Sequence, residues 1–129
     1  MNIPSNLKYT KNEEWLKVEG KVGTVGITDY AQNQLSDIVF AEIVVAIGDQ
    51  VKLGDICATI ESVKAAADVY LPVSGKIVEV NNQLPNSPEI INSDPYGNAW
   101  MVKVEISDPD EVNALFDAKG YEALLKEKE

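Results

Sequence analysis

The sequence predicts a mainly β fold, a small sandwich or barrel with short peripheral helices and a helical C-terminal segment. Short stretches of alternating apolar and polar residues recur along the chain, and glycine-containing turns separate them. Apolar residues at helical spacing dominate only near the end. The 129 residues are enough to bury one hydrophobic core. We therefore expect a single domain over 1–129, with its core over 14–106 and helices over 108–128.

The first two elements are a hairpin and a short helix. The segment "EWLKVEGKVGTVGI", residues 14–27, alternates on both sides of Gly20, which permits the positive φ of a tight turn. It predicts a β-hairpin. In the following "TDYAQNQL", Thr28 is a suitable N-cap and Asp29 places an acid in the first turn, which predicts a helix of about two turns ending near Ser36.

Further strands are expected in the middle of the chain. The strand-like segments are 37–45, 50–53, 56–60, 69–71 and 76–80. In "ICATI", residues 56–60, the alternation predicts that Ile56, Ala58 and Ile60 point inward, opposite to Cys57 and Thr59.

The last third of the chain combines loops, one strand and helices. Closely spaced prolines after Asn81 predict a loop-rich stretch, and "AWMVKVEI" predicts a final strand ending at Ile106. Asp108 is the expected cap of a helix that begins at Pro109. The residues expected to face inward from this region are Val112, Leu115, Phe116, Tyr121, Leu124 and Leu125.

Charge composition limits the kinds of partner. The formal net charge is −10, and all eleven cationic residues are lysines. Arginine is the residue best suited to bidentate recognition of phosphate and guanine. An acidic chain without arginine is therefore not expected to bind nucleic acid or anionic membranes, and basic protein partners are favoured.

Histidine and cysteine usage limits the chemistry. The chain has no histidine, which removes the commonest general base and metal ligand, so we expect neither self-contained acid–base catalysis nor a metal site. The single cysteine, Cys57, cannot form an internal disulfide, and no segment is long and apolar enough to span a membrane. A cytoplasmic location is expected, although a cleaved organellar presequence would leave no trace.

Lys64 is the strongest candidate site. It lies between two strand-like segments and is followed by Ala65, Ala66 and Ala67, which are too small to crowd an approaching molecule. At the tip of such a connection, an amide with a carboxylic cofactor would make a mobile tether for a carrier protein. An incidental surface lysine on a hairpin is the simpler interpretation, and the pattern does not decide between them. A Schiff-base lysine would need an apolar pocket that this context does not predict.

Two other positions have alternative interpretations. Cys57 lies among apolar strand residues, so a packing role is favoured over that of a nucleophile. Glu13 and Glu14 form an acidic pair before Trp15, which is either solvated surface or the polar lining of a cleft. No phosphate-binding glycine loop or calcium-loop spacing is present.

The segment "IESVKAAADVYLPVSGKIVEVN", residues 60–81, resembles the lipoylation segment of the glycine cleavage system H protein family. Three other segments resemble that family in the same order: "LKYTKNEEW", "VGITDYAQNQLSDIVFAEI" and "NSDPYGNAWMVKVE". The resemblance covers nearly the whole chain. It implies a lipoyl-domain-like flattened barrel, or barrel-sandwich hybrid, with Lys64 on a hairpin.

The resemblance also implies the chemistry. Lipoic acid, joined covalently to Lys64, would carry the aminomethyl intermediate of glycine between glycine decarboxylase, a pyridoxal-phosphate enzyme, and the tetrahydrofolate-dependent aminomethyltransferase. Dihydrolipoyl dehydrogenase would reoxidise the arm, and a lipoate ligase or lipoyl transferase would attach it. The carrier itself would be a non-catalytic monomer. By motif position, Glu14 and Asp68 would line the cleft that holds the loaded arm.

Two residues depart from the family pattern. Glu13 and Gln34 stand where the family often has histidines, so polar contacts of those imidazoles would be missing or replaced. Three other interpretations remain at this stage. One is an H-like protein that relays or donates lipoate without glycine cleavage activity. Another is a biotin carrier, although Val63 and Ala65 occupy the places of the usual methionines. The third is an unmodified interaction module.

Overall fold

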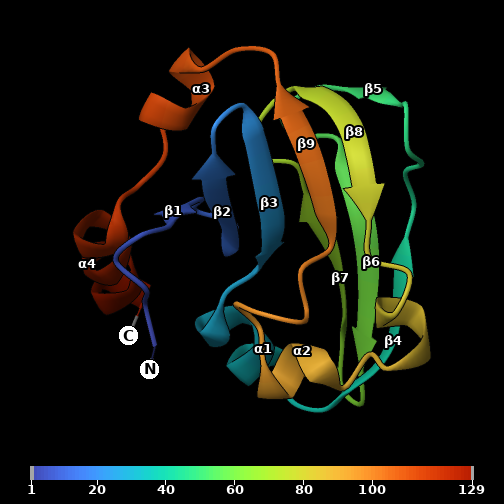
Figure 1. Ribbon diagram of the computed structural model, residues 1–129. Helices are drawn as coiled ribbons and strands as arrows, with labels where there is room; N and C mark the ends of the chain where they lie inside the picture. Colours follow the sequence, from blue (N-terminus) through green and yellow to red (C-terminus); the bar gives the residue numbers. More distant parts are fainter. Residues whose placement is uncertain (1, 129) are drawn as a thin grey trace.

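Two antiparallel β-sheets form the fold, with short helices at their edges and a longer helix at the C-terminus (Figure 1). The computed structural model describes residues 2–128. The larger sheet has the spatial order β1 (Lys8–Tyr9), β2 (Glu14–Glu19), β3 (Val22–Ile27), β9 (Val102–Ile106), β8 (Gly75–Val80) and β5 (Gln50–Val51). The smaller sheet has the order β4 (Ile38–Ile43), β6 (Ile56–Ser62) and β7 (Ala66–Tyr70). These two sheets confirm the mainly β sandwich.

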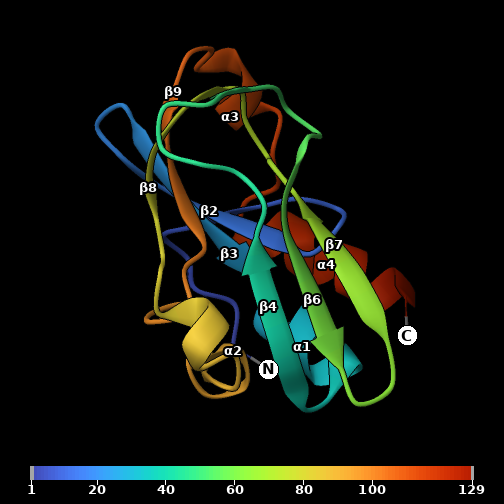
Figure 2. The same ribbon diagram turned by 90° about the vertical axis from the view of Figure 1, so that its right-hand side faces the viewer.

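The helices are short apart from the last one. They are α1 (Asp29–Leu35), the 3₁₀ turn η1 (Leu84–Asn86), α2 (Ile90–Ser93), α3 (Asp110–Asn113) and α4 (Ala118–Lys128). Figure 2 shows the smaller sheet in front, with α1 close to its lower end and α4 behind it. Within residues 2–128, no helix is long and apolar enough to cross a membrane.

The main hydrophobic core lies between the two sheets. Val25, Ile77 and Val104 of the larger sheet and Ile60 and Val69 of the smaller one are almost completely buried in it. Along β8 and β9, buried residues alternate with more exposed ones, so these strands present one apolar face to the smaller sheet. The core therefore holds the smaller sheet, and the hairpin it contains, firmly on the larger one.

The predicted hairpin and first helix are confirmed. β2 and β3 pair in register around Gly20, whose φ is 64°. Thr28 caps α1, because its hydroxyl oxygen accepts a hydrogen bond of 3.2 Å from the Ala31 amide. The helix ends at Leu35, and Ser36 is its C-cap.

The inward position predicted for Ile56 is wrong. Ile56 is 40% exposed, whereas Cys57 and Ala58 are both buried. The pairing of β6 with β7 is irregular here: Ile56 is opposite Tyr70, and Ala58 is opposite Val69. This bulge inserts one residue into β6 and shifts the alternation of its side chains, so Cys57 takes the core position.

The helix predicted after Pro109 is shorter than expected, and Phe116 does not face inward. α3 ends at Asn113, and Phe116 is 39% exposed. The Phe116 and Tyr9 backbones exchange two hydrogen bonds of 2.8 and 2.9 Å, so the chain is extended here and cannot continue as a helix. Pro109 is the N-cap of α3, which begins at Asp110, so the predicted cap at Asp108 and the predicted start at Pro109 are each one residue too early. The Asp108 carboxylate still accepts a hydrogen bond of 3.1 Å from the Asp110 amide.

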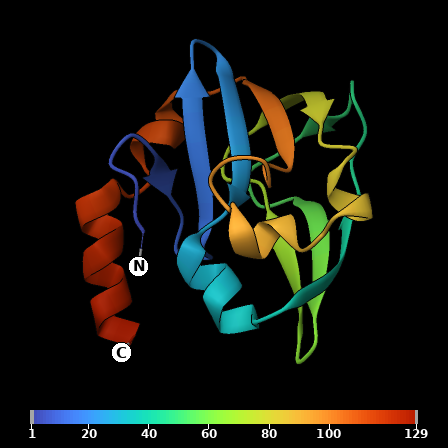
Figure 3. The same ribbon diagram turned by 60° about the horizontal axis from the view of Figure 1, so that its bottom comes forward.

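A second apolar cluster joins α4 to the N-terminal segment, and Figure 3 shows the two side by side. Tyr121 of α4 stacks on Tyr9 of β1, with ring centroids 4.6 Å apart and an interplanar angle of 7°. Leu7, Trp15 and Leu125 complete the buried part of this cluster. The C-terminal helix is therefore fixed against the residues that lead into β2.

Candidate functional site

Lys64 lies in the exposed tip that connects β6 to β7. In Figure 3 this hairpin extends beyond the neighbouring elements. The tip is ordered by Ser62: its hydroxyl oxygen accepts hydrogen bonds from the Lys64 and Ala65 amides, at 3.2 and 3.0 Å. The Ser62 amide also donates to the Ala65 carbonyl at 2.7 Å. The amine is thus presented to solvent from a short, hydrogen-bonded turn.

The base of the hairpin is anchored on both sides. β6 is the central strand of the smaller sheet and pairs with β4 and with β7. The Val63 amide donates a hydrogen bond of 3.0 Å to the Asp37 carbonyl, just before β4. This arrangement limits the mobility of the hairpin and leaves the Lys64 side chain as its freely rotating part.

A cavity of about 190 Å³ lies between the N-terminal segment, α1 and β7. We call it the arm cleft. Its lining residues are Asn12, Glu13, Glu14, Ile27, Tyr30, Ala31, Gln34, Leu35, Ile60, Ala67, Asp68 and Val69. Asp68 is exposed and lies on β7, four residues after Lys64 in the sequence. The structure thus brings Glu14 and Asp68 together in one cavity on the same side of the fold as the hairpin.

Glu14 forms part of the wall of the arm cleft and is almost completely buried, with 2% of its surface exposed. Its carboxylate accepts hydrogen bonds from the Thr10 hydroxyl and, at 3.1 Å, from the Tyr70 amide. Burial raises the pKa of Glu14 to about 7, although these two hydrogen bonds oppose the shift. The solvated-surface interpretation is therefore wrong for Glu14, and the cleft interpretation agrees with its position.

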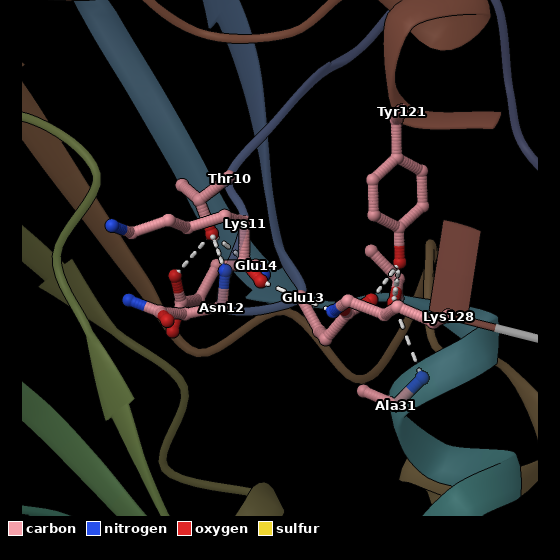
Figure 4. A network of polar contacts seen from close by, with 9 residues as sticks. Thr10, Lys11, Asn12, Glu13, Glu14, Ala31, Tyr121 and Lys128 are labelled. Carbon is pink, nitrogen blue, oxygen red and sulfur yellow. Dashed lines mark hydrogen bonds and ion pairs between the residues drawn. The ribbon is translucent and has the colours of Figure 1, made fainter. Parts of the chain in front are cut away.

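Glu13 makes contacts that the sequence did not predict. It has a φ of 72°, a left-handed conformation that is unfavourable for a glutamate. Its carboxylate accepts hydrogen bonds from the Tyr121 hydroxyl and the Lys128 ammonium group, both on α4 (Figure 4). The sequence predicted only an inward position for Tyr121 and no contact for Lys128. These residues are more than 100 positions from Glu13, and no local pattern indicates the pairing.

A second, larger hollow lies on the other side of Glu14. It has a volume of about 470 Å³, and Tyr9, Tyr70 and Phe116 are among its lining residues. Glu14 and Asn12 line both cavities. The N-terminal segment that precedes β2 therefore separates the two.

The other sequence candidates have structural roles. Cys57 is fully buried, and burial raises the pKa of its thiol to about 12, so it stays protonated and serves as a packing residue, as predicted. Among residues 2–128, no three potential metal-binding side chains form a cluster.

Comparison with known proteins identifies the family. The model of the family described as glycine cleavage H-protein matches residues 7–128. The chain belongs to this family. It is 51% identical over 126 residues to the glycine cleavage system H protein of Carboxydothermus hydrogenoformans, which covers 98% of this chain and 96% of the relative. The corresponding protein of Symbiobacterium thermophilum is 50% identical over 126 residues and covers 98% of each chain.

A solved structure confirms the fold. The crystal structure of a glycine cleavage system H protein from Mycobacterium marinum aligns with a TM-score of 0.86 at 34% identity, over 96% of this chain and 99% of that one. The fold is of the lipoyl-domain-like barrel-sandwich kind that the family resemblance implied. Membership of the glycine cleavage H-protein family makes this chain a carrier component of the glycine cleavage system, with the shuttle role of that component. The alternative of a lipoate relay without glycine cleavage is not favoured.

Proposed function

We propose that Lys64 carries lipoic acid as an amide and that the chain shuttles a glycine-derived aminomethyl group among the enzymes of glycine cleavage. The observation that supports this most strongly is the exposed amine on an anchored hairpin, on the same side of the fold as the arm cleft. When attached, the lipoyl group would supply a cyclic disulfide: one sulfur would take the aminomethyl group as the S–S bond breaks, and the other would become a thiol. The protein supplies the attachment point at Lys64, the hairpin that orients the lipoyl arm, and a cleft that shelters the loaded arm from water.

The tip suits a modifying enzyme. Ser62 holds the turn through two backbone amides, so the Lys64 side chain starts from a fixed position. Its neighbours Ala65 and Ala66 are small and exposed, which leaves space for the active site of a lipoate ligase or lipoyl transferase. Amide formation removes the lysine charge and lengthens the side chain, and both changes favour a mobile arm.

The residues of the arm cleft fit a loaded arm. Ile27, Leu35 and Val69 give it apolar walls that suit an aliphatic chain. Glu14 and Asp68 add two carboxylates, which suit the cationic end of the arm. A cation beside Glu14 favours the ionised form of its carboxyl group, so binding opposes the effect of burial on the pKa.

The partners in this proposal are glycine decarboxylase, aminomethyltransferase and dihydrolipoyl dehydrogenase, with the carrier itself non-catalytic and monomeric. The net charge of −10 supports docking on basic partner surfaces. Because the sequence has no histidine, proton transfers during the cycle are assigned to the partner enzymes. A cytoplasmic location is part of the same proposal.

Reconstituted exchange between glycine and labelled bicarbonate tests the function. The wild-type chain, incubated with lipoate and a ligase, should support exchange by glycine decarboxylase, and Lys64→Arg should support none. Lys76→Arg, which changes an exposed lysine on β8, is the matched control and should behave as wild type. Lipoate uptake without exchange would instead indicate a relay, and exchange by Lys64→Arg would contradict the assignment of Lys64.

A further inference from the structure

Two of the walls of the arm cleft belong to different parts of the chain, in addition to the wall formed by β7. One is the N-terminal segment, which contributes Asn12, Glu13 and Glu14. The opposite wall is α1, which contributes Tyr30, Ala31, Gln34 and Leu35. The separation of these walls determines whether a bound arm is shielded from water.

One hydroxyl group on α4 contacts both walls. The Tyr121 hydroxyl donates a hydrogen bond to the Glu13 carboxylate, which can only accept (Figure 4). Its oxygen lies 2.8 Å from the Thr28 hydroxyl, which is therefore the donor in that contact. Thr28 caps α1 through the Ala31 amide. Tyr121 thus joins Glu13 on one wall to the start of the helix that forms the other.

Lys128, at the end of the same helix, also contacts residues of both walls. Its ammonium group pairs with Glu13 and lies 5.9 Å from the centre of the Tyr30 ring, on the opposite wall. Neither Tyr121 nor Lys128 lines the arm cleft. Their contacts with the Glu13 side chain also help to offset the unfavourable φ of 72° at this glutamate.

We propose that Tyr121 and Lys128 are positioning residues of the arm cleft. They hold its two walls at a fixed separation and so set how long a loaded arm stays sheltered. The inference rests on the proposed function, because the sheltered group is the one that Lys64 would carry. It adds a role for the C-terminal helix, which lies outside the two sheets and does not reach the cavity.

The first test uses the unlipoylated protein. Tyr121→Phe keeps the ring stacked on Tyr9 but removes the hydroxyl group. We expect amide hydrogen exchange at Glu13, Thr28 and Ala31 to become about tenfold faster, the order expected for the loss of a hydrogen bond to a charged group. Amides in β6 and β7 should exchange as in wild type. Unchanged exchange at the three amides, or an equal increase at all amides, would overturn the inference.

The second test measures the sheltering itself. The loaded carrier is separated from its partners, and the release of its aminomethyl group to water is followed as formaldehyde and ammonia. Tyr121→Phe should release it about tenfold faster, and Lys128→Met about twofold faster because that ion pair is partly exposed. Lys128→Arg should restore the slow release. Attachment of lipoate to Lys64 should be unchanged in all three variants.

The matched control lies on the same helix. Lys126 and Glu122 form an exposed i,i+4 ion pair that contacts neither wall, and Lys126→Met should leave both readouts unchanged. If wild type takes up no lipoate, the proposed function fails. Amide hydrogen exchange of the unlipoylated protein then still decides whether α4 positions the walls. If wild type is loaded but Tyr121→Phe and Lys128→Met release the group at the wild-type rate, the positioning role is wrong and the shuttle role remains.

Discussion

The buried carboxylate of Glu14 accepts a hydrogen bond of 3.1 Å from the Tyr70 amide, which ties β2 of the larger sheet to the end of β7 in the smaller one. β7 begins just after the tip that presents Lys64. The same carboxylate forms part of the wall of the arm cleft. One acidic group therefore serves both the packing of the sheets and the lining of the cavity, and its protonation should affect both.

Glu14 should make stability depend on pH. Its pKa is raised from 4.5 to about 7 by burial, so the native state binds more protons than the unfolded state between these values. The stability of wild type relative to Glu14→Gln should therefore fall as the pH rises from 4.5 to 7. The relative change should be about 3 kcal/mol at most. Denaturant unfolding of both proteins across this range measures it, and parallel pH profiles would contradict the raised pKa.

Filling the arm cleft should expose the loaded arm without preventing its attachment. Ala67 lines the cavity, and Ala67→Leu occupies part of its volume of about 190 Å³. We expect lipoate attachment within about twofold of wild type and about tenfold faster release of the carried group, because water is no longer excluded from it. Ala123→Leu, at an exposed position of α4 outside the cleft lining, is the control. Equal release rates for the two variants would show that the cavity does not shelter the arm.

The turn that presents Lys64 should depend on the Ser62 hydroxyl. Ser62→Ala removes the acceptor for the Lys64 and Ala65 amides, and we expect these two amides to exchange about fivefold to tenfold faster. Ser62→Thr keeps a hydroxyl group and should stay close to wild type. Hydrogen exchange of the unmodified protein provides the measurement. If the Lys64 and Ala65 amides of Ser62→Ala exchange hydrogen at the wild-type rate, the turn is ordered by its backbone hydrogen bonds alone.

Gly75 should be among the positions least tolerant of a side chain. A Cβ atom at Gly75 would lie 2.0 Å from the Glu105 carbonyl oxygen, a backbone atom of the adjacent strand β9 that cannot move aside. Gly75→Ala should therefore lower the free energy of unfolding by about 3 kcal/mol or more. Gly20→Ala meets no atom within 4 Å and should cost only about 1 kcal/mol for its φ of 64°. Denaturant unfolding compares the two, and equal losses would contradict the predicted clash.

Local patterns predicted much of the fold and the exposed position of Lys64. The β2–β3 turn at Gly20 and the capping of α1 by Thr28 depend on residues close in sequence, so their signals are visible without the fold. The alternation placed Cys57 on the outer face of its strand, whereas its side chain is buried in the core. The error arises because the β-bulge between β6 and β7 leaves no clear signal in the alternation of a single strand. Phe116 faces solvent because its backbone pairs with Tyr9, a partner more than 100 residues away.

The candidate site was predicted less completely than the fold. Residue types and family resemblance indicated Lys64, Glu14 and Asp68, and the structure places the two acids in one cavity. The contacts of Tyr121 and Lys128 with Glu13 could not be predicted, since they depend on how α4 packs against the N-terminal segment. Long-range packing of this kind is fixed by tertiary structure and leaves no periodic pattern in the sequence.

The most direct test of the central proposal is the mass of the protein after incubation with lipoate, ATP and a lipoate ligase. We predict that wild type gains the mass of one lipoyl group, that peptide mapping places it on Lys64, and that Lys64→Arg gains none. A wild-type protein that stays unmodified under conditions that lipoylate a known carrier, or one modified at another lysine, would contradict the account.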